Sequence, residues 1–214
     1  MSTDTPNDDA PSREEIADTW RWKQDAASWQ ASLAFPGSEA ATVNRWMAAT
    51  IAGLLGDFTP LARVRTATLL ADDGPTRLTR QADVPYAQFR ELLLDAIGGH
   101  PLPATDVELD LDVRVWVRTT ASPDRPELAW LSYPGIQLEL HLDDSAWVDF
   151  SIENTLFSAF TYPDEDPNPL YPLNQPLLEA ALRRLRARAT EPLDRSGELN
   201  GTYEFGFSSD RDDY

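Results

Sequence analysis

Carboxylate side chains recur at alternate positions in three stretches of the second half of the chain, together with two tryptophans and a histidine. The candidate site residues in these stretches are Glu108, Asp110, Asp112, Trp116, Glu139, His141, Asp143, Trp147, Asp149 and Glu153. Carboxylates can ligate a metal ion, transfer protons in general acid–base catalysis, or attract a cationic partner. These three kinds of chemistry differ in the geometry that they need, so the elements that carry the residues decide between them.

Each of the three stretches alternates between apolar and polar residues. In residues 106–118, Val and Leu occupy one parity, and Asp, Glu, Arg and Trp occupy the other; residues 136–143 and 146–153 follow the same pattern. A period of two predicts β-strands with one face buried and one face in water. If the three strands pair with one another, their outer side chains form a sheet face rich in carboxylates, which is the best functional lead in the sequence.

A metal site needs ligands that converge on one point. Glu108, Asp110 and Asp112 stand at every second position of one strand, about 6.5–7 Å apart, so they line up instead of converging. Convergence would need partners from other strands, such as Glu139 or Asp149. The chain also lacks the glycine-containing calcium loop. We therefore expect a solvated face, with no metal and no cofactor.

Catalytic motifs are weak or missing. His141 and Asp143 form a His-x-Asp pair, but the chain has only two histidines, and such a pair alone is weak support for a hydrolase or a zinc site. The nucleophile elbow, the phosphate loop and the dinucleotide fingerprint are absent from the sequence. We therefore favour surface placement for His141 and a function other than catalysis.

The tryptophans leave two interpretations open. Trp116 and Trp147 fall on the polar parity of their strands, and Trp20, Trp22 and Trp29 cluster near the N-terminus. Either another segment covers these rings, or they are aromatic anchors of a surface that binds a basic protein. Four arginines between residues 183 and 188 resemble a phosphate site, but the last turns of a helix also favour positive charge, and we expect that structural role.

The charge balance limits the partners. The chain has 214 residues, 36 acidic and 18 basic, for a formal net charge of −18. Such a surface repels nucleic acids and anionic membranes and attracts basic proteins. The basic residues are 17 arginines and one lysine, Lys23, which fits a GC-rich genome or adaptation to high salt. Cysteine is absent, which removes thiolate chemistry and cysteine metal sites.

The ends of the chain are polar and acidic. Residues 1–11 are predicted to be a disordered tail, residues 12–208 one domain with possible subdomains at 12–100 and 104–208, and residues 209–214 an acidic tail. The first residues lack the basic and apolar regions of a signal peptide, and no run approaches the roughly 20 apolar residues of a membrane span. We therefore expect a cytoplasmic protein.

Periodicity and turn residues predict the remaining elements. In the first half we expect a short helix opened by Ser12, two strands in 20–35 (with a helix as the alternative), a helix over 38–55 ended by Gly56, a hairpin of 61–71 and 76–81, and a helix capped by Asp83. In the second half we expect a short strand at 127–133, an irregular loop over 162–176, a helix over 176–189 capped by Asn174, and a strand at 202–207. This mixed order predicts an α+β fold with a mainly antiparallel sheet and three main helices on one face.

Two functions from different classes remain. The first is a protein that neutralises or escorts a basic partner, such as a bacterial immunity protein against a toxin or a chaperone for a secreted effector. The acidic face would then be its contact surface. The second is an enzyme or small-ligand-binding domain from a salt-adapted or GC-rich organism, in which the acidity serves only solubility.

Overall fold

The structure is a computed structural model. It describes residues 22–34, 40–132, 135–160, 166–197 and 202–209. The predicted tail over 1–11, the helix opened by Ser12, Trp20 and the turn at 36–37 lie outside the described residues. The side chains of residues 22–26 and 40–41 also lie outside them.

Most strands belong to one eight-stranded sheet. Its order is β3-β2-β4-β6-β7-β1-β8, and β5 pairs with β4 beside this path; every pairing is antiparallel. The strands are β1 (Trp22–Leu33), β2 (Ala62–Ala71), β3 (Thr76–Thr79), β4 (Ala104–Thr119), β5 (Ser122–Leu131), β6 (Ile136–Leu142), β7 (Ala146–Asn154) and β8 (Asp194–Ser196). A small hairpin of β9 (Thr202–Tyr203) and β10 (Gly206–Phe207) forms a second sheet.

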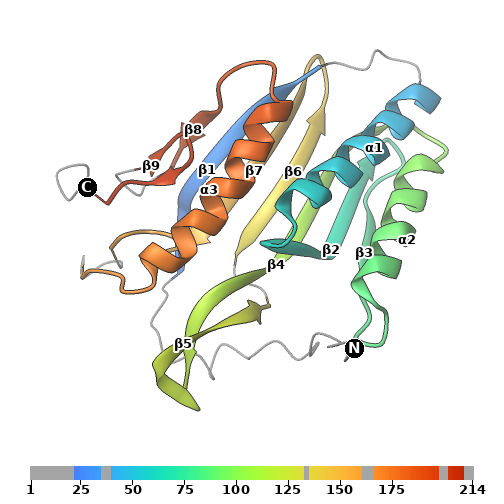
Figure 1. Cartoon of the computed structure of the whole chain (residues 1–214). Coiled ribbons are helices and arrows are strands. Elements are labelled where there is room, and N and C mark those ends of the chain that lie inside the picture. The colour runs from blue at the N-terminus through green and yellow to red at the C-terminus, as the bar shows by residue number, and fades with distance from the viewer. Residues whose placement is uncertain (1–21, 35–39, 133–134, 161–165, 198–201, 210–214) are drawn as a thin grey trace, which may run out of the picture.

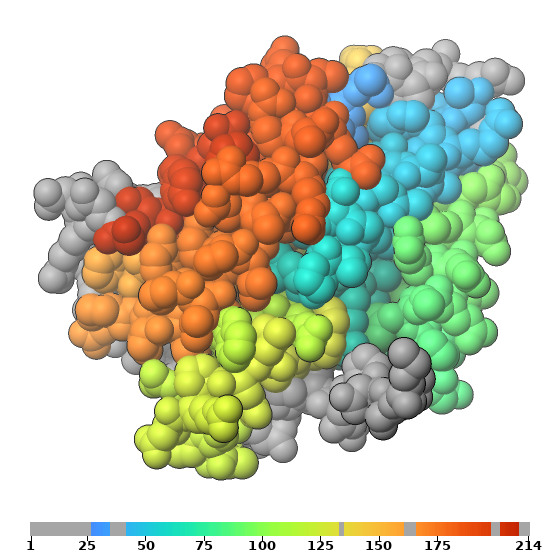
Figure 2. Space-filling model, in the orientation of Figure 1, coloured from blue at the N-terminus to red at the C-terminus, as the bar shows by residue number. Residues whose placement is uncertain are grey.

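Three helices lie on one face of the large sheet, as Figure 1 shows. They are α1 (Ala40–Phe58), α2 (Tyr86–Gly98) and α3 (Tyr171–Arg188). In the space-filling view of the same side, the helices cover most of the sheet, and the β4–β5 hairpin projects beyond them (Figure 2). The predicted α+β class, with a mainly antiparallel sheet and three helices on one face, is therefore confirmed.

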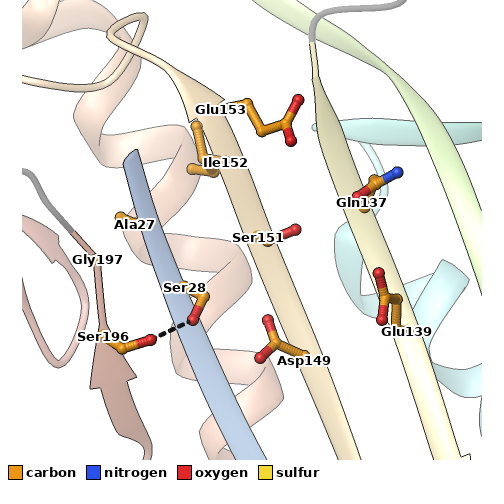
Figure 3. Close-up of a pocket in the computed structure, with 10 residues that line it drawn as sticks. All are labelled: Ala27, Ser28, Gln137, Glu139, Asp149, Ser151, Ile152, Glu153, Ser196 and Gly197. Atoms are coloured by element: carbon orange, nitrogen blue, oxygen red, sulfur yellow. Dashed lines mark hydrogen bonds between the residues drawn. The ribbon is translucent and has the colours of Figure 1, made fainter. Parts of the chain in front are cut away.

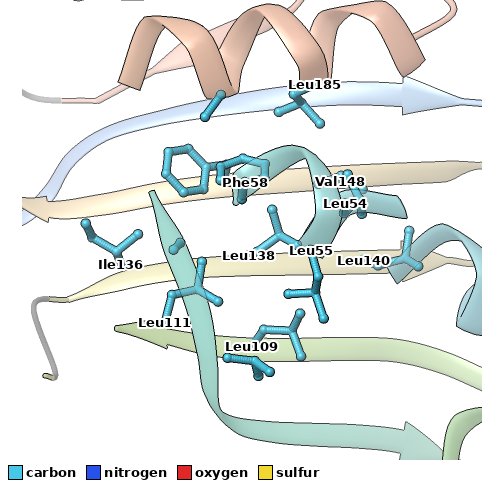
Figure 4. Packing of buried hydrophobic residues seen from close by; sticks show 14 of the residues in the cluster. Leu54, Leu55, Phe58, Leu109, Leu111, Ile136, Leu138, Leu140, Val148 and Leu185 are labelled. Carbon is cyan, nitrogen blue, oxygen red and sulfur yellow. The ribbon is translucent and has the colours of Figure 1, made fainter. Parts of the chain in front are cut away.

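The hydrophobic core fills the space between these helices and the sheet (Figure 4). The apolar parity of the alternating strands supplies one wall, including Leu109, Leu138 and Val148, and the helices supply the other, including Leu54 and Leu185. Full burial of such a side chain stabilises the fold by about 1.5–3 kcal/mol. Because this parity is fixed to the core, the opposite parity of the same strands must face away from the helices.

The three acidic strands are neighbours, in the order β4-β6-β7. In β6 and β7 the burial follows the predicted alternation: the apolar parity is buried, and the residues between are partly exposed; Asn154, at the end of β7, is a polar residue on the buried parity. The predicted hairpin of β2 and β3 and the predicted strand β5 are also present. The sheet combines β1, β2 and β3 from the first half of the chain with the later strands.

Several predicted boundaries in the first half are wrong. The segment expected to form two strands is one strand, β1, whose register with β7 shifts between Trp22 and Ala27. Gly56 does not end α1, which continues to Phe58. Asp83 does not cap α2, whose N-cap is Pro85 without a side-chain cap. One glycine and one aspartate are weak local signals for the end and the start of a helix, and tertiary packing can override such signals.

The end of the chain also differs from the prediction. Helix α3 begins at Tyr171, so Asn174 lies inside its first turn and Pro176 lies within the helix. Asn174 is buried, and its amide accepts from the Trp116 N–H at 2.7 Å and donates to the Trp116 carbonyl at 3.0 Å. The strand predicted at 202–207 is the β9–β10 hairpin, since Gly206 at φ +127° allows the chain to turn. The short strand β8 was not predicted.

Candidate functional site

Three carboxylates from three neighbouring strands stand directly opposite one another on the face away from the helices. Glu108 of β4 pairs with Glu139 of β6, and Glu139 pairs with Asp149 of β7. We call these three residues the carboxylate row. Like charges directly opposite on a sheet are destabilising, because their side chains lie within about 5 Å of each other at the Cβ atoms. The row is therefore a site where the fold concentrates negative charge.

Asp149 is the most perturbed member of the row. Its Oδ1 is buried and meets no hydrogen-bond donor within the described parts of the chain. Burial, followed by the charge of Glu139, raises the pKa of Asp149 from 3.8 to about 6, although His141 opposes the rise. Partial burial and the neighbouring carboxylates also raise the pKa of Glu108. A buried carboxylate oxygen without a donor is unfavourable.

A cavity of about 290 Å³ opens beside Asp149 on this face. Glu139, Asp149 and Glu153 contribute carboxylates to its wall, and Gln137 contributes an amide. The remaining lining residues are Ala27, Ser28, Ser151, Ile152, Ser196 and Gly197. The lining residues come from β1, β6, β7 and β8 and the residue after β8, and α3 lies behind the sheet in Figure 3, which places the cavity on the open side of the sheet.

The serines at one end of the cavity come from β1, β7 and β8. Ser28 of β1 stands opposite Ser151 of β7 on one side and opposite Ser196 of β8 on the other. The Ser28 and Ser196 hydroxyls are hydrogen-bonded at 2.8 Å (Figure 3). Each hydroxyl can donate and accept, so this end of the cavity is polar without adding charge.

His141 lies beside the row between two carboxylates. Its Nδ1 is 2.6 Å from Asp106 Oδ1, and its Nε2 is 3.1 Å from Glu139 Oε2. The ring stacks on Trp147 with centroids 3.8 Å apart. Each ring nitrogen therefore lies at hydrogen-bond distance from a carboxylate oxygen. His141 is partly exposed, as expected for a surface residue, and it fixes the orientation of Glu139.

Asp112 does not belong to the open face, although it has the same parity as Glu108 and Asp110. Its side chain is fully buried, so the prediction that it lies in water is wrong. Arg65 donates to both of its oxygens, at 2.6 and 3.3 Å, and Arg63 lies 3.7 Å away. Tyr86 Oη donates to Asp112 Oδ2 at 2.5 Å. We call these four residues the Asp112 cluster.

A register shift in β2 explains why sequence parity failed at Asp112. Val64 pairs with Leu111 and Thr66 pairs with Asp110, so Arg65 is an extra residue between them. Bulges of this kind redirect a side chain, and here both Arg63 and Arg65 contact Asp112. Burial, and then the hydrogen bond to Asp112, raise the pKa of the Tyr86 phenol to about 12.

The other predicted site residues are dispersed. Asp110 is partly exposed and accepts from Gln137 Nε2 at 3.0 Å. Asp143 is exposed in the β6–β7 turn, where it accepts from the Ser145 N–H at 3.0 Å. Trp116 is partly exposed far along β4, beside Asn174. The structure therefore brings together Glu108, Asp110, Glu139, His141, Trp147, Asp149 and Glu153, and it separates Asp112, Trp116 and Asp143 from them.

The cavity also contains residues that sequence reasoning missed. Gln137 and Ser151 were on the outward parity, which was the available signal for them. Ser28 and Ser196 gave no signal, because their position depends on β1 and β8 lying beside β7. Among the described residues, no group of three His, Asp or Glu side chains is placed to hold a metal ion.

The arginines near the end of α3 stabilise helix contacts. Arg184 donates to the carbonyls of Asp57 and Thr59, at 2.8 and 3.1 Å, and Arg188 bonds to the Asp57 carboxylate. Arg183 pairs with Glu179 one turn away. These contacts tie α3 to the C-terminal end of α1, which is a structural role.

Comparisons with protein family models, with curated proteins and with solved structures find no match to this chain. None of the helices in the described part of the chain is long and apolar enough to cross a membrane. The function must therefore be argued from the geometry of the carboxylate row and the cavity beside it.

Proposed function

We propose that this chain is an acidic binding protein that captures a basic protein on the open face of its sheet and neutralises or escorts it. Its simplest biological role is that of a bacterial cytoplasmic immunity protein that blocks a toxin. The observation that carries the proposal is Asp149: among the described residues its buried oxygen has no donor, and it lies in a row with two further carboxylates beside an open cavity.

The energetics of the row favour this proposal. Opposed carboxylates destabilise the sheet, and folded proteins usually retain such conflicts where function requires them. A cationic side chain from a partner would relieve the repulsion and pair with the Asp149 carboxylate where it lines the cavity. The partner's cationic group would therefore contribute most to the binding free energy at the carboxylate row, where the carboxylates of the free protein repel one another.

The surroundings of the row suit protein recognition. Trp147 is partly exposed next to the row and is held rigidly by its stack on His141. Tryptophan anchors beside charged groups are typical of binding hot spots, and a field of one sign accelerates the approach of a partner of opposite sign. A stoichiometric inhibitor needs such a complementary surface and no reactive group.

Charge reversal on the row tests the proposal. The double variant Glu139→Lys with Asp149→Lys, and the matched control Glu91→Lys with Asp95→Lys, have the same net charge. The control residues are exposed on α2, which lies on the other face of the sheet. We expect a basic protein captured from the source organism to bind the control normally. It should bind the row variant at least roughly a hundredfold more weakly, measured by calorimetry with the purified partner.

Equal binding by the two variants would contradict the proposal, because the attraction would then depend on net charge alone. A toxicity or enzyme assay of the captured partner separates neutralisation from escort, since an inhibitor abolishes the partner's activity and a chaperone preserves it. The salt response separates both from a salt-adapted enzyme. Capture should weaken as NaCl rises, whereas a salt-adapted fold should become more stable through screening of its self-repulsion.

A further inference from the structure

The groups that surround Asp149 differ in charge from one neighbouring strand to the next. Glu139 stands opposite Asp149 on β6, with His141 two residues further along that strand. On β1 the opposite residue is the neutral Gln30, and beyond it lies Asp194 of β8. On β7 itself, Ser151 and Glu153 continue along the cavity wall. His141 is the cationic group that acts on Asp149 among these residues, and it already contacts two other carboxylates.

Two kinds of group can offset the charge of the Asp149 carboxylate, which lines the cavity. A proton converts the carboxylate to an acid, which removes the charge and supplies a hydrogen for a bond to a neighbouring oxygen. Alternatively, an ammonium or guanidinium group from another molecule keeps the carboxylate ionised and donates to it. Both groups relieve the same carboxylate, so they compete.

We infer that a basic side chain of the partner enters the cavity, pairs with the Asp149 carboxylate between Glu139 and Glu153, and takes the place of a proton there, so that capture is coupled to proton release. This inference rests on the proposed function and deepens it, because it names the ligand group and the regulation of the same site. The ligand group is the ammonium of a lysine or the guanidinium of an arginine. Glu139 and Glu153 accept its remaining N–H groups, and the serine hydroxyls accept those that point toward β8.

The direction of the pH effect follows from competition for Asp149. Near neutral pH the carboxylate is ionised and ready to bind, because its pKa of about 6 lies below the pH. Below about pH 6 the proton must leave before the cation can bind, so the apparent affinity falls by up to about tenfold per pH unit. Acidification therefore releases the partner, and the released proton goes to the buffer when binding occurs.

Calorimetry with a defined probe tests the coupling. The probe is a hexa-arginine peptide with blocked ends, titrated into the full chain in two buffers of different ionisation enthalpy. The dependence of the measured heat on the buffer gives the number of protons released. We expect release of a substantial fraction of one proton at about pH 6 and almost none at about pH 8, with binding roughly tenfold weaker at about pH 5 than at about pH 7.5.

Two variants complete the experiment. Asp149→Asn should bind the probe more weakly at about pH 8, should release no protons at about pH 6, and should lose the pH dependence between them. The control Glu91→Gln with Asp95→Asn removes two charges from α2 and should behave like the unchanged protein.

The possible failures have different meanings. If the probe binds at about pH 8 but releases no protons at about pH 6, or if Asp149→Asn releases as many as the unchanged protein, the inference is wrong while the proposed function stands. If the probe does not bind the unchanged protein even at about pH 8 and low salt, the open face does not attract basic groups, and both fail.

Discussion

Asp112 and Asp149 both occupy positions of outward parity in the strands of one sheet, but their surroundings are opposite in kind. Asp112 is fully buried and receives two bonds from Arg65, one from Tyr86 and a charge contact from Arg63. Asp149 is partly buried beside two further carboxylates, and one of its oxygens meets no donor within the described structure. The chain supplies its own cations to the first and leaves the second unsatisfied.

The difference between the two aspartates distinguishes a carboxylate that stabilises the fold from a carboxylate whose charge a partner can pair with. A buried carboxylate can be stabilised by nearby arginines, and the Asp112 cluster is such an arrangement, at the end of the sheet where β2, β4 and β5 meet. Within the described parts of the chain, no arginine forms an ion pair with the carboxylate row, although the row is closer to water. The row is therefore the part of the face where an external cation gains the most.

The largest expected effect comes from removing the satisfied aspartate. Asp112→Ala leaves the Arg65 guanidinium and the Tyr86 hydroxyl without their shared acceptor in a partly buried site. Loss of one partner from a buried ion pair usually destabilises by about 3–5 kcal/mol, and we expect a loss in that range. Urea denaturation at neutral pH measures it. A loss below about 1 kcal/mol would show that the Asp112 cluster is not a structural centre.

Much of the sheet could be predicted because its information is local. Alternation in residues 106–118, 136–143 and 146–153 fixes which parity is buried, and the short turn between β6 and β7 makes those strands neighbours. Element ends were less predictable. Gly56 and Asn174 have the residue types of a helix end and a helix cap, but both lie inside helices, and Asn174 bonds there to the backbone of Trp116.

The candidate site was predictable only in part, for a related reason. Glu108, Glu139 and Asp149 follow from parity and strand order together. Asp112 has the same parity, but the extra residue Arg65 and the distant Tyr86 enclose it, and neither contact leaves a local pattern. The cavity needs β1 and β8, which pair with β7 from distant parts of the chain. Parity shows which face a residue is on and not what covers it.

A smaller effect is expected from the tyrosine that helps to satisfy Asp112. Tyr86→Phe removes one hydrogen bond to a buried carboxylate while Arg65 remains, so we expect a loss of about 1.5–2 kcal/mol by urea denaturation. Tyr171→Phe removes a bond to the neutral carbonyl of Phe207 and should have a smaller effect, of about 1 kcal/mol. Equal losses would mean that the charge of Asp112 adds nothing to its bond with Tyr86.

The smallest effect, and the most informative sign, is expected at Asp149. Because its pKa rises on folding from 3.8 to about 6, the folded chain holds this proton more tightly than the unfolded chain does. The stabilisation is therefore complete below about pH 4 and is lost as the pH rises through about 6. Asp149→Asn removes the charge, so it should stabilise the protein at neutral pH and change little in acid. Because water still reaches part of the carboxylate, we expect a gain of only about 1 kcal/mol.

Denaturation of Asp149→Asn at about pH 4 and about pH 7.5 checks this sign. Glu91→Gln is the control, since Glu91 is exposed on α2, and it should change stability at neither pH. A variant that loses stability at neutral pH would mean that Asp149 has a stabilising partner, as Asp112 has. A variant that is more stable but binds basic groups more weakly would show that the Asp149 carboxylate supports binding at a cost in folding stability. That result would distinguish Asp149 from Asp112, whose carboxylate stabilises the fold.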